Sequence, residues 1–591
     1  MNTELFGVFG DEDAFSRFRD SSSFDRVVEG DALTVGVRDA GFGIPGRTDV
    51  HASEEDLCVL WGEAYLPEST TPAERVLERA GAAGPDVLAD VNGSHLAVVE
   101  RSGSGESVRA GESCRSGGSG ESGGAAYVAT DPARTWDCFY TDAPGVRVFG
   151  SDAFAVARTI PEPTVRRDGL LEFLHLGVVL GDATLLDELR RVPFDGRLHA
   201  DRTETFERFV YDRAEFDYVG QLAARLERAL ARRARLPGRT GALLSAGYDS
   251  RVLLAGAPDV DAGYTVTRRG GREAEVAARI ADQYDSDHAA FEADGDYLNT
   301  DFETVRYGNG IRESIHVHQG GYADRMDADA MYHGLLFDTF LRGHFLPRDS
   351  VAVLGYSLPR ERLATDFDPA RRLVADKFGF VSLTDHAADL DGVDFGVGVE
   401  SEEFARDAVA REFDLLDWRF DSQLDGCAAV GIANQPTLSF RTHLANHFLE
   451  AFPAADAELL DWHLRTPPEY RTTETFRKAL KRIDGDILRH RPPDRPHDSH
   501  ALNQIEQFVR ARTPLLSDFE NAWPDRREEY ARANLDAELF PDRPELHALP
   551  VRLKLRINDA QTWLGELASV SEPGVGEILA PSEEGFRLGS V

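Results

Sequence analysis

The stretch Gly241-Ala-Leu-Leu-Ser-Ala-Gly-Tyr-Asp-Ser250 passes from a short apolar run into a turn that contains glycine, serine and aspartate. The apolar run predicts a buried strand that ends at Ser245, with a helix beginning after the turn. Residues 261–267 then form a second predicted strand, and residues 273–284 a second predicted helix. This alternation is typical of βαβ units. We therefore expect a parallel sheet with its ligand site beyond the carboxyl ends of the strands.

The turn carries groups that suit an anion. Backbone N–H groups and the positive end of the helix dipole converge at such a corner. Gly247 lets the backbone approach a phosphate, and the hydroxyls of Ser245 and Ser250 can donate hydrogen bonds. Asp249 can hold a hard cation through oxygen. A plain strand-to-helix corner would use similar residues, and this structural alternative stays open at this point.

Residues 245–250 resemble the pyrophosphate-binding loop of the asparagine synthetase family, Ser-Gly-Gly-x-Asp-Ser, with Ala246 as a departure. Residues 264–267 are similar to the family strand whose edge receives the adenine. The family's next helix and strand are matched at Glu273, Ala277, Ile280, Ala281 and His288. The resemblance implies ATP bound at Ser245, Gly247, Asp249, Ser250 and Thr265.

Residues 331–343 resemble the family's second metal segment, Ser-Gly-Glu-Gly-x-Asp-Glu-x-x-Gly-Gly. The residues in register are Gly334, Asp338 and Gly343, and the departures are Leu336, Thr339 and Arg342. The resemblance implies that Gly334 contacts the nucleotide and that Asp249 and Asp338 bind Mg²⁺. An aspartate that only caps a helix at Asp338 is the structural alternative.

Residues 473–482 resemble the family's Lys-x-x-Leu-Arg helix, whose lysine contacts the phosphates. Strict register places Arg477 at the lysine position and Lys481 at the arginine position. The lysines of the chain are Lys377, Lys478, Lys481 and Lys554. A pair at Lys478 and Lys481 in so lysine-poor a chain favours phosphate contact, with a solvated helix face as the alternative. Glu303 loosely matches the segment that bears the family's catalytic glutamate, which implies proton transfer there.

Residues 1 to about 160 show short apolar alternations broken by Gly, Asp and Pro, which predict an antiparallel β domain. Residues 102–124 are nearly all Ser, Gly and Glu, a composition typical of an insertion without a core. This half resembles the class II glutamine amidotransferase domain of the same family at three segments, which are Gly62–Tyr65, Asn92–Ala97 and Ala129–Arg134.

The resemblance fails at the nucleophile, because Phe6 stands where the family has cysteine. That cysteine must be the first residue of the mature chain so that its own α-amine acts as base, and five residues precede Phe6. We therefore expect no glutamine hydrolysis. β-Lactam synthetases, which the chain resembles in this loss, keep the fold without the cysteine.

We thus expect an α/β and α+β protein of two domains. Residues 1–212 should form a degenerate antiparallel β-sandwich-type, Ntn-like amidotransferase domain. Residues 213–591 should form a parallel-sheet α/β ATP-pyrophosphatase domain with extra helices.

Acidic residues outnumber basic ones by 103 to 65, for a formal charge of −38. Such a field repels nucleic acids and anionic lipid, so we expect neither as a partner. Carboxylates are spread through the chain, which favours a halophilic, salt-rich cytoplasm over one acidic patch for a basic partner. The four cysteines lack C-x-x-C spacing, and no apolar run approaches the ~20 residues of a membrane span. The N-terminus has no basic n-region, so we expect a soluble, cytoplasmic protein.

The resemblance implies AMP-forming amide-bond synthesis through an acyl-adenylate, with ATP and Mg²⁺, as in asparagine biosynthesis. Aspartate is one candidate acid, and ammonia or another amine is the nucleophile; a homodimer is one option for assembly. The alternative is a noncatalytic nucleotide-binding or assembly protein of the same family. Its sequence support is Ala246, Leu336, Thr339 and Phe6.

Overall fold

A computed structural model describes most of the chain, and two compact units emerge from it. The described residues are 1–54, 56–67, 69–83, 87–101, 125–258, 260–353, 356–387, 400–497, 499–510, 512–513, 519–520 and 523–568. Unit 1 comprises Met1–Pro163 and Glu188–Arg208, and unit 2 comprises Thr164–Asp187 and Phe209–Val591. The expected boundary at residue 212 lies close to the last of these divisions, but Thr164–Asp187 groups with unit 2. The Ser/Gly-rich stretch 102–124 lies outside the described residues.

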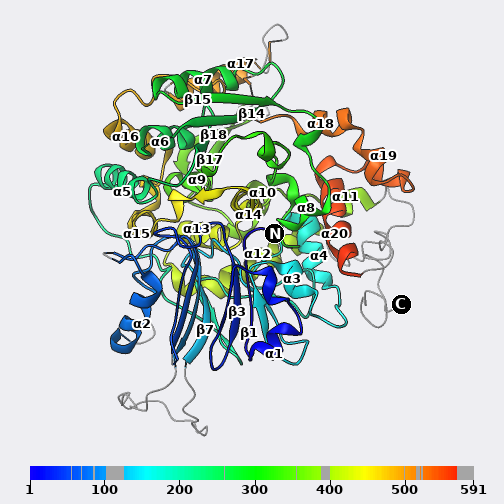
Figure 1. The fold of residues 1–591 in the computed structure, drawn as a ribbon. Helices are drawn as coiled ribbons and strands as arrows, with labels where there is room; N and C mark the ends of the chain where they lie inside the picture. The colour runs from blue at the N-terminus through cyan, green and yellow to red at the C-terminus, as the bar shows by residue number, and fades with distance from the viewer. Residues whose placement is uncertain are drawn as a thin grey trace. The chain divides into compact units, whose positions relative to one another are not determined.

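Unit 1 is built on two six-stranded antiparallel sheets (Figure 1). The first has the order β10-β8-β9-β1-β3-β2, with β1 Glu4–Val8, β2 Arg26–Glu29, β3 Thr34–Arg38, β8 Phe139–Thr141, β9 Val148–Gly150 and β10 Arg190–Arg191. The second has the order β12-β11-β7-β6-β5-β4, with β4 Asp49–Ala52, β5 Asp56–Gly62, β6 His95–Arg101, β7 Ala125–Thr130, β11 Gly196–Leu198 and β12 Thr203–Thr205. Its helices are α1 Glu12–Ser16, η1 Ser21–Ser23, α2 Pro72–Ala83 and α3 Ala153–Ala157.

Phe6 lies in the middle of β1, a strand whose residues are all buried. It pairs with Gly36 of β3 on one side and with Gly150 of β9 on the other. Its ring packs edge-on against Phe15 at 5.9 Å between centroids, and the Arg19 guanidinium lies 5.1 Å from it. The position where the family has its nucleophile is therefore a packed core position here.

Unit 2 contains a parallel sheet of the order β15-β14-β13-β16-β19. Its strands are β13 Thr240–Leu243, β14 Ala262–Thr267, β15 Asp287–Glu292, β16 Ala330–Tyr332 and β19 Leu449–Ala451. The predicted strands at 241–245 and 261–267 are both present. The core on this sheet includes Tyr264, Val266, Phe291, Met331 and Leu444. A separate hairpin pairs β17 Arg348–Val353 with β18 Tyr356–Leu363.

Helices surround this sheet. α6 packs against β13 and α5, α7 packs against β14 and β15, and α16 packs against α5, α6 and α9 (Figure 1). The α-helices of unit 2 are α4 Arg167–Leu176, α5 Tyr218–Arg232, α6 Tyr248–Gly256, α7 Glu273–Gln283, α8 Phe302–Arg306, α9 Phe337–Arg342, α10 Pro369–Asp376, α11 Thr384–Ala387, α12 Ser401–Leu416, α13 Gln423–Ala433, α14 Leu438–His447, α15 Ala457–Arg465, α16 Thr473–Ile483, α17 His500–Arg510, α18 Arg526–Ala533, α19 Leu535–Leu539 and α20 Val551–Ala568. Short 3-10 turns are η3 Gly295–Tyr297, η4 Ser314–His316, η5 Gly320–Arg325, η6 Asp417–Arg419, η7 Pro453–Ala455, η8 Pro468–Tyr470 and η9 Pro544–Ala548.

The local sequence explains the helices that frame the site. Asp217 caps α5 by accepting the N–H of Gly220, and Thr472 caps α16 by accepting the N–H of Thr475. Both helices bury one apolar face. At the mixed α/β level, with antiparallel sheets and one parallel five-stranded sheet, the predicted fold class is confirmed. In the part of the chain that the structure describes, no helix combines the length and apolar composition needed to cross a bilayer.

Candidate functional site

The strand order places two predicted segments at one crevice. The chain leaves β13 toward β14 on one side and leaves β16 toward β19 on the other, so a crevice opens between their carboxyl ends. Gly334 follows β16, and a Cβ atom built there would lie 3.1 Å from the Cβ of Asp249. Only glycine lets these two loops approach so closely without displacement. The structure thus brings together the loop at 245–250 and the loop at 333–336.

Side chains hold the loop after β13 in one shape. The Ser250 hydroxyl accepts the N–H of Ser245 at 3.0 Å, and the Ser245 hydroxyl accepts the N–H of Gly247 at 3.1 Å. Arg251, on α6, donates to the carbonyls of Ala246 at 2.7 Å and Gly247 at 3.0 Å. These contacts satisfy two carbonyls of the loop from within α6. The loop is therefore set before any ligand arrives.

The buried carboxyl of Glu273 fixes the remaining loop amide. It accepts the N–H of Ala246 at 2.6 Å. Burial raises the pKa of Glu273 to about 7, which the Ala246 N–H opposes. Ala246 has no positive φ, so its departure from the family's glycine leaves the backbone path unstrained. Gly247 begins α6 with φ −68°, and a Cβ there would meet only the Ser245 Oγ within 4 Å. Open space thus lies in front of the helix N-terminus.

These loops line a cavity of about 410 Å³, which we call the strand-end cavity. Its volume lies in the range of small-molecule sites. The residues predicted for the nucleotide and the metal all line it, namely Ser245, Gly247, Asp249, Ser250, Thr265, Gly334 and Asp338. Thr265 is buried, and its hydroxyl donates to the carbonyl of Leu244 at 2.8 Å. The sequence motifs therefore converge on a single cavity.

An arginine pairs with one of the two predicted metal ligands, and its charge acts on the other. Nη1 of Arg342 lies 2.8 Å from each carboxylate oxygen of Asp249. Burial and the nearby Asp338 raise the pKa of Asp249, which Arg342 opposes. Burial also acts on Asp338, but its pKa lies below the ordinary value because His344 and Arg342 stabilise the carboxylate.

This donor set does not fit a magnesium ion while Arg342 holds that place. Both oxygens of Asp249 already accept from Arg342, and Asp338 pairs with His344 at 3.3 Å. Thr339 stands where the family has a third carboxylate, and its side chain is buried beside Gln435. Among the described residues, no group of three or more His, Cys, Asp or Glu side chains is placed to hold a metal ion.

Asp338 does not cap α9. The N-cap is Leu336, which makes no side-chain capping bond. Leu336 adopts the left-handed conformation, with φ 65°, where the family has glycine. This conformation costs a leucine on the order of 1 kcal/mol, whereas glycine adopts it freely. Gly343, with φ 64°, ends the helix.

Three predicted residues lie elsewhere. Glu303, on α8, is exposed and lines neither the strand-end cavity nor the larger cavity described below. Lys478 is exposed and pairs with Glu474 at 3.2 Å, and Lys481 is exposed on the same helix. Arg477, the residue in strict register with the family's lysine, does face the larger cavity. Its guanidinium also lies 5.7 Å from the ring of Tyr248.

Sequence analysis missed several residues of the strand-end cavity. His318 lines it, and within the described part of the chain neither of its ring nitrogens has a hydrogen-bond partner. The same is true of Oε1 of Gln319. Burial lowers the pKa of His318 to about 3, so the ring is neutral. Trp523 packs edge-on against it at 4.4 Å between centroids. The sequence alone does not predict this group, because its residues lie far apart in the chain and no local motif joins residues 318 and 523.

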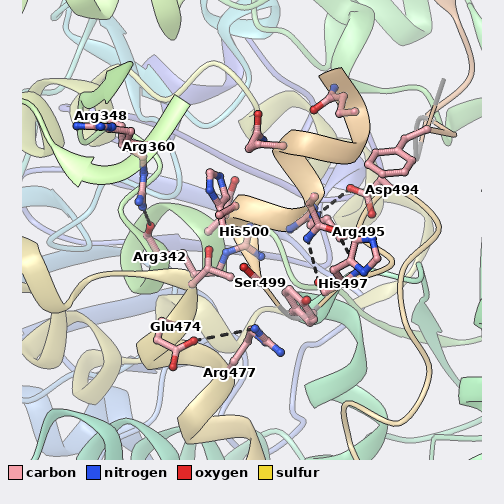
Figure 2. A pocket seen from close by; sticks show the side chains of 18 of the residues that line it. Arg342, Arg348, Arg360, Glu474, Arg477, Asp494, Arg495, His497, Ser499 and His500 are labelled. Carbon is pink, nitrogen blue, oxygen red and sulfur yellow. Dashed lines mark hydrogen bonds and ion pairs between the residues drawn. The ribbon is translucent and has the colours of Figure 1, made fainter. Parts of the chain in front are cut away.

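A second cavity of about 910 Å³ adjoins the first, and we call it the basic cavity. The two cavities share Tyr248, Asp338, Arg342, Asp494 and Arg495. In Figure 2, Arg342, Arg348 and Arg360 lie on one side of the basic cavity, and Asp494, Arg495 and His497 lie on the other.

A scan against models of protein families finds no match for this chain, and a search of curated proteins finds none either.

Proposed function

We propose that the chain is an AMP-forming carbon–nitrogen ligase that activates a carboxylate with ATP, in the manner of asparagine synthetases. One observation carries the proposal. The turn at 245–250 and the segment at 334–338, recognised separately in the sequence, meet at the switch point of a parallel sheet and line one cavity. The open N-terminus of α6, in front of Gly247, faces that cavity and suits a phosphate group.

The reaction proposed has two steps. An oxygen of the substrate carboxylate attacks the α-phosphorus of ATP, the bond from that phosphorus to the bridging oxygen breaks, and pyrophosphate leaves with the electron pair. The product is an acyl-adenylate. The amine nitrogen then attacks the acyl carbon, AMP leaves, and the nitrogen loses a proton to give the amide.

Arginines supply the positive charge that these steps need. Arg342 and Arg495 line both cavities and therefore flank the region where the phosphates would lie. Fixed cations of this kind stabilise the charge that develops on a departing pyrophosphate. Arg251 and Glu273 keep the loop in shape, so its N–H groups need no reorganisation when the nucleotide binds.

The finer domain identities belong to the same proposal. The antiparallel sheets of unit 1 support a class II amidotransferase-type domain without its nucleophile, because Phe6 is a core side chain. The strand order of unit 2 supports an ATP-pyrophosphatase-type domain. Ammonia or another amine, rather than glutamine, then supplies the nitrogen.

A second candidate function is a noncatalytic nucleotide-binding protein. The observation that favours it is the pairing of Asp249 with Arg342, together with Thr339 in place of a carboxylate. Such a protein would bind ATP and release no pyrophosphate with any acid and amine.

The test is to supply ATP, a panel of acids that includes aspartate, and ammonium at high salt, and to follow AMP and pyrophosphate. Asp249→Asn removes the charge that orients Arg342, and Glu275→Gln, at an exposed position of α7, is the matched control. Pyrophosphate release that Asp249→Asn abolishes and Glu275→Gln preserves supports the ligase. ATP binding without release selects the second candidate, and absence of ATP binding overturns both.

A further inference from the structure

The basic cavity has a charge opposite to that of the chain. Acidic residues outnumber basic ones by 103 to 65 in the whole sequence. Around this cavity, six arginine and lysine side chains face four carboxylates, and the cations are Arg342, Arg348, Arg360, Lys377, Arg477 and Arg495. They come from separate elements, including α9, the β17–β18 hairpin, the end of α10 and α16. The fold therefore gathers positive charge from separate elements around this cavity.

The carboxylates of the cavity already have partners. Asp338 pairs with His344 at 3.3 Å, and Asp494 pairs with Arg495 at 2.9 Å. Glu474 pairs with Lys478 at 3.2 Å, and Glu520 accepts the N–H of Arg272 at 2.5 Å. Each of the four thus has a partner of its own, and the charge of Asp338 also acts on Lys377, which lies on the hairpin side of the cavity.

On the side of the cavity formed by the β17–β18 hairpin and the end of α10, two cations have no hydrogen-bond or ion-pair partner among the described residues. Within the described residues, the side chains of Lys377 and Arg360 form neither a hydrogen bond nor an ion pair, and both line the cavity. Burial lowers the pKa of the half-buried Lys377; the charges of Asp376 and Asp338 oppose this shift, and those of Arg348 and Arg372 add to it. Cations held together in this way gain free energy from an anion that lies between them.

We propose that the basic cavity binds further anionic groups of the acid substrate, which is therefore a polyanion such as a tricarboxylate or a phosphorylated acid. Calling this anion the acid substrate rests on the proposed function. The cavity adjoins the strand-end cavity through Asp338 and Arg342, so one molecule can place its reactive carboxylate in the first and its other charges in the second. At about 910 Å³ against 410 Å³, the basic cavity also has more room than aspartate would need.

The experiment is calorimetric titration of the full chain with citrate, 3-phosphoglycerate, glutarate and aspartate, each with and without α,β-methylene-ATP. The variants are Lys377→Gln and Arg360→Gln. Arg362→Gln is the matched control, because Arg362 lies on the same strand as Arg360 but does not line the cavity and pairs with Asp349 at 3.9 Å. Loss of one charge-assisted contact weakens binding by about tenfold or more.

We expect citrate or 3-phosphoglycerate to bind more tightly than glutarate or aspartate, both with and without the nucleotide analogue. Either cavity variant should lose about tenfold in affinity, and the control should lose none. Tighter binding of citrate would identify a tricarboxylate as the ligand, and tighter binding of 3-phosphoglycerate would identify a phosphorylated acid. Exclusion of the acid by the analogue, equal affinity for aspartate, or insensitivity to both variants would overturn the inference. Polyanion binding without pyrophosphate release in the ligase assay would instead refute the proposed function and leave the anion site standing.

Discussion

Nη1 of Arg342 holds both carboxylate oxygens of Asp249, at 2.8 Å each. Asp249 comes from the turn after β13, and Arg342 ends α9 after β16, so this pair bridges the two loops of the crevice. The family that the sequence resembles has glycine at the arginine's position and a metal between its carboxylates. The guanidinium of Arg342 is thus a covalently fixed cation beside Asp249, where the sequence resemblance implied a Mg²⁺ ion.

The first prediction concerns the carboxylate of Asp249 once its ion pair with Arg342 is removed. Arg342→Ala leaves Asp249 and Asp338 side by side without the guanidinium, and two carboxylates so placed attract a divalent cation. We expect Mn²⁺ to raise the melting temperature of Arg342→Ala by several degrees, roughly what a ligand at 100 times its Kd would give. Wild type should show no such shift.

The double variant Arg342→Ala with Asp249→Asn is the control for this effect. It removes one of the two ligands and should lose the Mn²⁺ shift. An equal Mn²⁺ shift in wild type would contradict the assignment of Arg342 as the resident cation.

A second prediction separates two glycines by their backbone. Gly247 has φ −68° and open space before it, whereas Gly343 has φ 64° and a Cβ there would lie 2.6 Å from the carbonyl oxygen of Arg471. Gly247→Ala should change stability by less than about 1 kcal/mol, the range of an N-cap exchange, yet weaken ATP binding about tenfold because the methyl group blocks the helix N-terminus.

Gly343→Ala should behave in the opposite way. The left-handed backbone and the close carbonyl should cost about 2 kcal/mol of folding free energy. Urea unfolding and nucleotide titration of both variants measure the two effects. A Gly247→Ala variant that binds ATP as wild type does would show that phosphate does not approach this turn.

The third prediction concerns the nitrogen source. Phe6 lies within β1 after Leu5, so a cysteine placed there would carry a peptide amide and no free amine to act as its base. We expect neither wild type nor Phe6→Cys to release glutamate from glutamine. Ammonium should support amide formation in both. Glutamate release by wild type would mean that another nucleophile is at work.

Leu336 and Lys478 show which features could be predicted from the sequence and which could not. The motif at 245–250 and the strand spacing predicted the parallel sheet and the lining of the strand-end cavity. The mismatch at Leu336 put the backbone path of that loop in doubt, and the structure has a left-handed residue there, which side-chain type alone does not predict for leucine. Scarcity of lysine pointed to Lys478, whereas helix phase turns Lys478 to solvent and Arg477 to the cavity.

The groups that sequence reasoning missed are those assembled by tertiary packing alone. Arg342 was read as a departure from a motif, and only the fold shows that it reaches Asp249, 93 positions away along the chain. His318 and Trp523 are likewise far apart in the sequence, and their contact is visible only in the fold. The basic cavity draws on a hairpin, several helices and the loop at residues 494–497, so no single stretch of sequence carries its signal.

The last prediction concerns pH and the buried carboxyl of Glu273. Burial raises its pKa to about 7 from the ordinary 4.5, so the folded state binds the proton more tightly than the unfolded state does. Below pH 4.5 the carboxyl is protonated in both states, and from there to about pH 7 the folded state alone keeps the proton, so the free energy of unfolding falls as pH rises through this range. Above pH 7 the cost of the buried charge is complete, on the order of 3 kcal/mol.

Glu273→Gln removes this titration and keeps an oxygen that can accept the Ala246 N–H. We expect the variant to be more stable than wild type at pH 8 and to approach or fall below it at pH 5. Urea unfolding at both pH values measures the difference, with Glu275→Gln, exposed on the same helix, as the control. A constant difference between variant and wild type across this range would mean that Glu273 is ionised in the folded protein throughout, and that the loop is held by a charged group.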